Sequence, residues 1–168
     1  MDEPLEIERK FLIYRPDPAF LDGQGGEKWD IRQTYLTGTP EQGSRRVRRV
    51  RCGGEETWYY SEKVRITDRK RIEREKVVSP EEAEKLLREA DGEKRPIEKT
   101  RWRIPFGGRT LEIDVFPFWE KQAFCEVELP DEEAGFTLPD WVRVIREVSE
   151  DRRYNNNNLA RVIPEEEV

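Results

Sequence analysis

The sequence predicts an α+β fold in which antiparallel strands form a closed β-barrel with a charged interior, flanked by a few helices. Strand-like segments outnumber helical ones, glycine and proline clusters separate them, and charged residues alternate with apolar residues along almost every strand. An alternation of period two places the charged side chains of a strand on one face and the apolar side chains on the other. The 168 residues suit a single domain, 1–168, in which about 162–168 form a frayed acidic tail.

Eight segments have the composition and alternation of β-strands. They lie near residues 5–13, 30–37, 44–51, 57–64, 69–78, 98–105, 109–115 and 123–129. Two glycine pairs, at 53–54 and 107–108, separate neighbouring strand segments. Because two-residue hairpin turns need backbone angles that glycine adopts readily, each pair predicts a hairpin.

Helical patterns are fewer. Ser79 is a favourable N-cap, with proline at the next position and glutamate three residues on, which is the sequence of a capping box. Apolar residues at helical spacing follow, and Asp91-Gly92 is a typical helix end. A second helix is expected over residues 140–148, with Trp141, Ile145 and Val148 on one side.

Composition excludes several classes of function. The chain has a formal net charge of −6 and no histidine. An acidic protein has no global basic field, so we expect no nucleic-acid partner. Without histidine, a bound metal must rest on oxygen ligands. Two cysteines, Cys52 and Cys125, indicate a reducing compartment, and no apolar run approaches about 18 residues. We therefore expect a soluble, cytoplasmic protein with no membrane partner.

The first strand carries the most informative charges. Glu6, Glu8 and Lys10 fall on one face of that strand, and neighbouring carboxylates repel each other unless positive charge lies between them. The same spacing recurs along the chain in Arg46 and Arg48, Ser61 and Lys63, Glu73 and Glu75, Lys99, Arg101 and Arg103, Glu112 and Asp114, and Glu126 and Glu128.

Two interpretations fit this alternation. The charged faces of an ordinary β-sandwich could all lie in water. Neighbours of like sign, and the division of strands into cationic and acidic ones, instead favour the facing walls of a closed cavity. Arginine and lysine bind phosphate oxygens, whereas clustered carboxylates without histidine select Mg²⁺ or Mn²⁺. A cavity that holds both sets favours metal-assisted chemistry on a phosphate chain.

The segment Glu6-Ile7-Glu8-Arg9-Lys10 matches an ExExK signature. Further motifs follow in order as far as about residue 160: Arg46-Val47-Arg48, Lys63, Arg71-Ile72-Glu73-Arg74-Glu75, Glu98-Lys99-Thr100-Arg101, Leu111-Glu112-Ile113-Asp114, Glu126-Val127-Glu128-Leu129 and Asp151-Arg152-Arg153-Tyr154-Asn155. In these motifs the chain resembles the CYTH superfamily, the triphosphate tunnel metalloenzymes, and especially its compact bacterial single-domain members. The resemblance implies an eight-stranded antiparallel barrel that forms a tunnel and binds triphosphate inside.

The resemblance also implies a role for each matching position. The substrate-binding residues would be Lys10, Arg46, Arg48, Lys63, Lys99, Arg101 and Arg153. The ligands of Mg²⁺ or Mn²⁺, with two ions during turnover, would be Glu6, Glu8, Glu126 and Glu128. Glu73, Glu75, Glu112 and Asp114 would line the tunnel. Lys10 and Glu8 would be the catalytic residues. Either of two arginine pairs in the segment 44–51 could face the tunnel: Arg46 and Arg48, or, if the strand contains a bulge, Arg49 and Arg51.

The function expected from this resemblance is an inorganic triphosphatase, which hydrolyses tripolyphosphate to pyrophosphate and phosphate with a divalent metal. Alternatives are a nucleoside or thiamine triphosphatase, an adenylate cyclase and a non-catalytic polyphosphate-binding module. No evident base-recognition element is present, which favours the small inorganic substrate. Two helices give little cover for the apolar exterior of a barrel, so the sequence is compatible with a homodimer.

Overall fold

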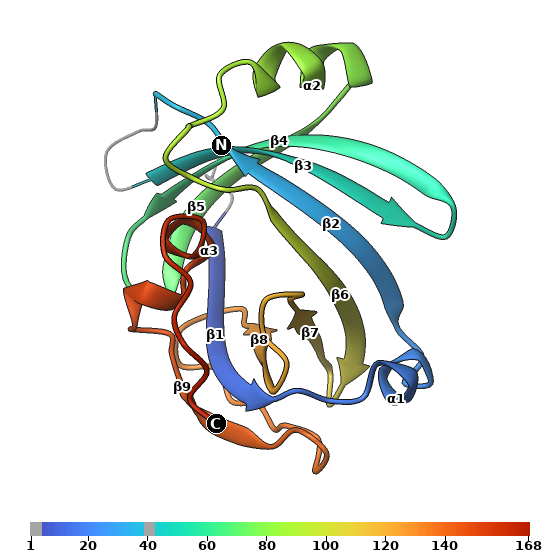
Figure 1. Cartoon of the computed structure of the whole chain (residues 1–168). Coiled ribbons are helices and arrows are strands. Elements are labelled where there is room, and N and C mark those ends of the chain that lie inside the picture. Colours follow the sequence, from blue (N-terminus) through green and yellow to red (C-terminus); the bar gives the residue numbers. More distant parts are fainter. Residues whose placement is uncertain (1–4, 39–42) are drawn as a thin grey trace.

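The computed structural model describes residues 5–38 and 43–168. Within them, nine strands form one antiparallel sheet in the order β5-β4-β3-β2-β6-β7-β8-β1-β9. The strands are β1 (Leu5–Tyr14), β2 (Glu27–Tyr35), β3 (Gly43–Cys52), β4 (Glu55–Arg65), β5 (Lys70–Val78), β6 (Ile97–Phe106), β7 (Arg109–Val115), β8 (Gln122–Glu128) and β9 (Val144–Glu147). The start of β1 also pairs with β5, which closes the first eight strands into a barrel (Figure 1). The predicted eight-stranded closed barrel is confirmed.

Both predicted glycine hairpins are present. Gly53 and Gly54 join β3 to β4, and Gly107 and Gly108 join β6 to β7. All four glycines have positive φ, between 58° and 84°, a backbone conformation that costs other residues energy. The local sequence therefore fixes where these two pairs of strands reverse direction.

One predicted helix is present and the other is wrong. Helix α2 (Pro80–Leu87) begins at Ser79 with the predicted capping box, although it ends before Asp91 because residues 88–90 turn back to pair with the end of β2. Residues 144–147, expected to be helical, instead form β9 and pair with β1 beside β8. The free edge of β1 supplies ladder partners, and valine and isoleucine favour a strand there.

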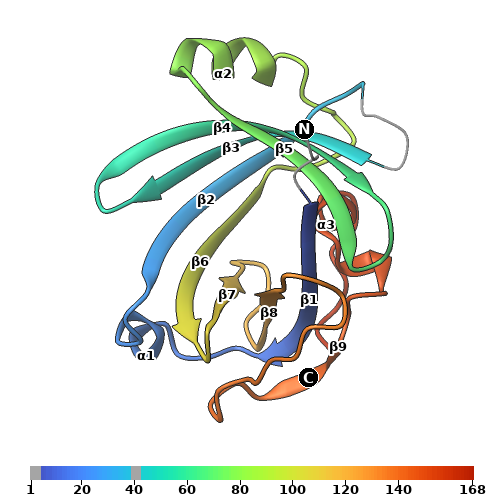
Figure 2. The ribbon, with the colours of Figure 1, turned by 180° about the vertical axis from the view of Figure 1, so that it is seen from behind.

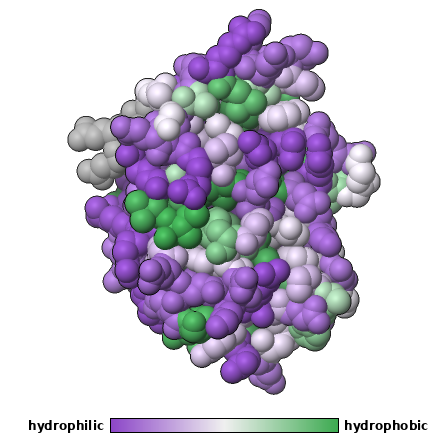
Figure 3. Space-filling model, in the orientation of Figure 1, coloured by the Kyte–Doolittle hydropathy of each residue, from purple (hydrophilic) through white to green (hydrophobic). Residues whose placement is uncertain are grey.

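Helices and loops cover the apolar exterior of the barrel. Helix α1 (Pro18–Asp22) and the segment 134–142 pack on the outer faces of β1, β6, β7 and β8, where Cys125 is fully buried. Helix α2 covers the outer faces of β3 and β4, on the opposite side of the barrel (Figure 2). Elsewhere the surface is mostly hydrophilic on the face seen in Figure 3, with apolar side chains gathered near its middle.

An aromatic cluster closes one end of the barrel interior. Leu12 and Phe124 lie opposite each other on β1 and β8, two residues beyond Lys10 and Glu126 on the same inward face. They pack with Phe116, Trp119 and Tyr154 in a buried cluster. Tyr154 belongs to the 3-10 helix η1 (Arg152–Tyr154), which precedes α3 (Asn156–Leu159). Charged residues therefore line only the part of the interior beyond this plug.

The C-terminal residues depart from the predicted frayed tail. The backbone carbonyl of Pro164 accepts a hydrogen bond from Trp119 Nε1 at 3.0 Å, and the Glu167 backbone N–H donates to Gln122 Oε1 at 2.7 Å. The carboxylate of Glu167 also binds Arg146. Contacts with the loop before β8, with Gln122 on β8 and with Arg146 on β9 therefore hold this segment against the barrel.

Candidate functional site

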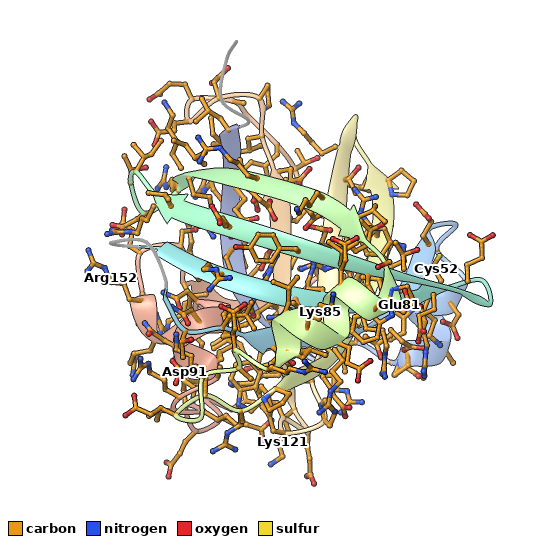
Figure 4. The ribbon with its side chains drawn as sticks, turned by 90° about the horizontal axis from the view of Figure 1, so that it is seen from above. Cys52, Glu81, Lys85, Asp91, Lys121 and Arg152 are labelled. Atoms are coloured by element: carbon orange, nitrogen blue, oxygen red, sulfur yellow. The ribbon has the colours of Figure 1, made fainter. Side chains whose placement is uncertain are left out.

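A cavity of about 780 Å³ lies inside the barrel. Of the site residues predicted from the sequence, all except Lys99, Asp114 and Arg153 line it: Glu6, Glu8, Lys10, Arg46, Arg48, Lys63, Glu73, Glu75, Arg101, Glu112, Glu126 and Glu128. Residues 148–157 complete its wall near the aromatic plug. Figure 4 shows Arg152 of this segment on the side of the barrel away from Cys52, at the tip of β3.

Strand register explains why these side chains meet. Opposite residues in an antiparallel pair lie on the same face of the sheet. Glu8 is opposite Glu128, and Lys10 is opposite Glu126, which in turn is opposite Glu112. The two walls are therefore of different sign: β1, β7 and β8 contribute mainly carboxylates, and β3 and β6 contribute cations.

The cationic wall settles which arginines of β3 face inward. Arg46 and Arg48 are 4% and 6% exposed and line the cavity. Arg49 and Arg51 lie on the outer face near Glu56. Burial, with the charges of Arg46 and Arg101 nearby, lowers the pKa of Arg48 to about 10, so the guanidinium stays charged at neutral pH. Arg48 therefore presents a positive charge to the cavity.

The inward arginines are only partly neutralised by the protein. Arg46 Nη2 lies 3.5 Å from Glu73 Oε1, and Arg48 Nη2 lies 3.1 Å from Glu75 Oε2. Within the described part of the chain, Arg48 Nε and Arg71 Nε are buried without a hydrogen-bond partner. Buried donors are normally paired, so the cavity can accept further anionic oxygens.

Lys10 is held from three sides at the plugged end of the cavity. Its Nζ donates to the backbone carbonyl of Tyr154 at 3.1 Å and lies 3.2 Å from Glu126 Oε1. The ammonium also lies 4.6 Å from the centre of the Phe124 ring, a favourable position for a cation. These contacts fix one charge at a defined place deep in the barrel.

The pKa values of Glu6 and Glu8 shift in opposite directions, although the two carboxylates are only two residues apart on β1. Burial, together with the charges of Glu126 and Glu6, raises the pKa of Glu8 well above its usual value. Burial opposes the ionisation of Glu6, but Lys63 and hydrogen bonds with Glu73 and Glu8 bring its pKa well below the usual value. The repulsion predicted from the sequence is therefore present, and the protein only partly relieves it.

The donor set fits a divalent cation. No group of three carboxylates is assembled as a ready coordination site among residues 5–38 and 43–168. Glu8 Oε1 instead lies 3.3 Å from Arg71, and Glu6 Oε2 lies 3.5 Å from Lys63. In that part of the chain, Glu6 Oε2 and Glu8 Oε2 are nevertheless buried without a hydrogen-bond partner. Buried carboxylate oxygens that accept no hydrogen bond are costly, and a hard cation such as Mg²⁺ or Mn²⁺ would satisfy them.

Three predicted site residues lie outside the cavity. Lys99 and Asp114 are buried deeper in the barrel, where Lys99 Nζ lies 5.9 Å from the centre of the Phe116 ring of the plug and donates to Asp114 Oδ2 at 2.8 Å. Asp114 also accepts two hydrogen bonds from Arg101, at 2.7 and 2.9 Å, and therefore holds Arg101 toward the cavity. Arg153 is exposed, and its guanidinium binds Asp151.

Sequence reasoning missed other cavity residues. Arg71 and Arg103 line the cavity from β5 and β6; both follow the period-two pattern of the sequence, although the resemblance gives them no role in the site. Trp29, Tyr35, Ser149, Arg152 and Asn155–Asn157 also line the cavity. The segment 148–157 has no strand periodicity, so its place depends on tertiary packing and gives no comparable signal.

Comparisons with known proteins agree with this architecture. The CYTH domain model matches residues 4–162. An inorganic triphosphatase of Acetivibrio thermocellus is 37% identical over 93% of each chain, and one of Nitrosomonas europaea is 34% identical over 95% of this chain and 99% of its own. The crystal structure of the inorganic triphosphatase NE1496 aligns with a TM-score of 0.58 at 32% identity, covering 95% of this chain and 97% of that one.

Proposed function

The chain belongs to the CYTH domain family, and from this premise we propose that it is an inorganic triphosphatase that depends on a divalent metal. Its substrate is tripolyphosphate, which it hydrolyses to pyrophosphate and phosphate inside the tunnel of a single domain, residues 1–168. Two relatives that it matches over nearly their whole length carry the name inorganic triphosphatase. Those names and the chemistry of the cavity support the proposal.

One observation supports this proposal most strongly: in the part of the chain that the structure describes, the cavity contains both carboxylate oxygens and guanidinium nitrogens that are buried without a hydrogen-bond partner. Glu6 Oε2 and Glu8 Oε2 lack a hydrogen-bond partner within the residues described, and so do Arg48 Nε and Arg71 Nε. A phosphate chain alone would satisfy the guanidinium donors but would be repelled by the carboxylates. A phosphate chain with a divalent cation satisfies both sets. An ordinary structural barrel gains nothing from such a wall.

The cationic residues bind and orient the phosphate chain. Arg46, Arg48, Lys63 and Arg101 present charges from β3, β4 and β6, and arginine forks bind phosphate oxygens in pairs. Arg71 joins this set because it lines the same cavity. Arg152 replaces Arg153 as the basic residue of the C-terminal segment, since Arg153 is outside the cavity. Lys99 acts indirectly, through Asp114 and Arg101.

The acidic residues near β1 would hold Mg²⁺ or Mn²⁺. Glu6 and Glu8 are the first candidates because each has a buried carboxylate oxygen without a hydrogen-bond partner among the described residues, and Glu126 and Glu128 come from the neighbouring strand β8. A divalent cation, when bound, neutralises phosphate charge and makes bound water a stronger nucleophile. Lys10, fixed between Tyr154 and Glu126, orients the reacting end of the chain at the plugged end of the tunnel.

The test is phosphate release from tripolyphosphate, ATP and thiamine triphosphate, each measured with Mg²⁺, with Mn²⁺ and with EDTA. We expect metal-dependent release that is fastest with tripolyphosphate. Faster release from ATP or thiamine triphosphate would assign a different substrate. Cyclic AMP from ATP would indicate a cyclase, and binding without release would indicate a polyphosphate-binding module. Any of these results overturns the proposal, and so does the absence of turnover with all three substrates.

The homodimer and the cytoplasmic location remain predictions. Leu5 and Val77 are 53% and 66% exposed, which leaves apolar side chains for a second copy to cover. Sedimentation equilibrium should give twice the chain mass, and a monomer at all concentrations would contradict it. Across the described ranges, no helix is long and apolar enough to span a membrane.

A further inference from the structure

Residues 164–167 connect the outside of the barrel to the segment that holds Lys10. The Glu167 carboxylate accepts hydrogen bonds from Arg146 Nε and Nη2, both at 2.8 Å, and one from the Tyr154 hydroxyl. Its backbone N–H donates to Gln122 Oε1 at 2.7 Å, and the Gln122 side chain is buried on β8. One residue thus joins β8, β9 and η1.

The same contacts stabilise the loop that lines the cavity. Arg146 Nη2 also donates to Asp151 Oδ2 at 2.9 Å, and Asp151 caps η1 by accepting from the Arg153 N–H. Arg146 lies over the Tyr154 ring, with its guanidinium carbon 5.4 Å from the ring centre. The Tyr154 ring is therefore held at its face by Arg146 and at its hydroxyl by Glu167.

Tyr154 connects these contacts with Glu167 and Arg146 to Lys10 in the cavity. Its side chain is 1% exposed and packs between Trp119 and Phe124 in the aromatic plug. Its backbone carbonyl accepts the hydrogen bond from Lys10 Nζ at 3.1 Å. Because its ring is packed in the plug and its hydroxyl is bonded to Glu167, the side chain restrains the backbone of Tyr154, whose carbonyl accepts from the lysine.

We propose that Glu167 is a positioning residue for the tunnel, which acts through Tyr154 to hold the Lys10 ammonium in place. The inference rests on the proposed function for its effect on turnover, but not for its effect on Lys10 itself. Glu167 bonds to Gln122, Arg146 and Tyr154, none of which is assigned to the metal or the substrate. Its ion pair with Arg146 and the hydroxyl of Tyr154 keep the pKa of Glu167 low, at about 2, so it is charged at neutral pH.

The first test compares Glu167→Ala with Glu165→Ala. Glu165 is an exposed neighbour in the same segment and makes none of these bonds. We expect Glu167→Ala to lower kcat/KM for tripolyphosphate roughly 3- to 10-fold, the effect of about one lost hydrogen bond, and Glu165→Ala to leave it unchanged. Tyr154→Phe removes the hydroxyl but keeps the ring, so it should reproduce most of the loss if Glu167→Ala folds poorly. Unchanged kcat/KM in Glu167→Ala and Tyr154→Phe overturns the proposal.

The second test observes Lys10 directly and needs no turnover. The Cε resonance of Lys10, followed by NMR in protein with labelled lysine and assigned by its loss in Lys10→Ala, should shift in Glu167→Ala and Tyr154→Phe but not in Glu165→Ala. A lower kcat/KM with an unshifted Lys10 resonance overturns the proposal, because the effect then travels by another route. If wild-type protein hydrolyses no triphosphate, the proposed function fails while the resonance still decides the positioning claim.

Discussion

At the scale of single residues, neighbouring positions of β3 have opposite surroundings. Arg48 is 6% exposed and faces the cavity, whereas Arg49 lies outside near Glu56. We predict that Arg48→Ala raises KM for tripolyphosphate roughly 10- to 100-fold, because one charged hydrogen-bonding group is worth about 1.5–3 kcal/mol. The matched control, Arg49→Ala, should change KM less than about twofold. Steady-state kinetics of both variants check this, and equal effects would contradict the assignment of faces.

A substitution of Glu8 tests whether the carboxylates of the cavity bind the metal. Glu8→Gln keeps the shape of the side chain but removes the charge of a proposed metal ligand, so kcat with Mg²⁺ should fall at least roughly 100-fold. The thermal unfolding midpoint should not fall, because burial and two nearby carboxylates raise the pKa of Glu8 in the folded protein and the neutral amide avoids that cost. Retained activity would show that the metal binds elsewhere.

We predict that Lys99 makes the free energy of unfolding depend on pH. Burial, with the charge of Arg101 nearby, lowers the pKa of Lys99 to about 7, while the unfolded chain keeps a lysine pKa near 10.4. Between these two values the unfolded state binds more protons, so the contribution of Lys99 to stability rises with pH. Compared with Lys99→Met, the wild type should therefore gain free energy of unfolding from pH 7 to pH 10 in urea titrations. A constant difference between the two proteins over that range would contradict the burial of a titrating Lys99.

Only those site residues that lie on strands could be predicted from the sequence, because the prediction rests on the alternation of side chains along a strand. Alternation along strands correctly indicates the inward faces of β1, β3 and β8, because the orientation of a strand side chain depends on its own position. Lys99 fits the same period, yet it does not line the cavity because it is buried beside Asp114 and Phe116 of the aromatic plug. That burial depends on the depth of the residue in the barrel, which alternation does not specify. Arg152 was missed because it belongs to η1, outside the strands, where alternation gives no signal.

At the scale of elements, helix α2 was predictable because its signals are local. The Ser79 hydroxyl accepts from the Glu82 N–H at 3.1 Å, and the Glu82 carboxylate bonds back to the Ser79 N–H. Strand β9 was not predictable in this way, since its hydrogen bonds are with β1, more than a hundred residues away in sequence. Its few residues carry a pattern that a helix would also fit.

The cap of α2 gives a stability prediction that is separate from function. Ser79→Ala should lower the free energy of unfolding by about 1 kcal/mol, the usual effect of losing an N-cap side chain. Catalysis should not change, because α2 packs on the outer face of the barrel and lines no part of the cavity. Urea titration and kcat/KM measured on the same preparation check both statements, and a loss of activity would show that α2 influences the tunnel.

At the scale of the whole molecule, the barrel has charged residues both on its hydrophilic exterior and in its interior cavity, and the two sets are arranged differently. The chain is acidic overall, with a formal net charge of −6, and most of the visible exterior is hydrophilic (Figure 3). The interior instead combines a cationic wall and an acidic wall in one cavity of about 780 Å³. Closure of the sheet brings together charges that lie far apart in sequence, such as Glu6 of β1 and Arg71 of β5. The barrel is thus the feature that turns a repeated strand pattern into a site.

The measurement that tests the central claim most directly is a crystal structure of the protein with Mn²⁺ and tripolyphosphate, with the metal located by anomalous diffraction. We predict an anomalous peak at the carboxylates of Glu6 and Glu8, and a phosphate chain inside the barrel against Arg46 and Arg48. A metal and an anion that bind only outside the barrel, with the cavity free of both, would contradict it.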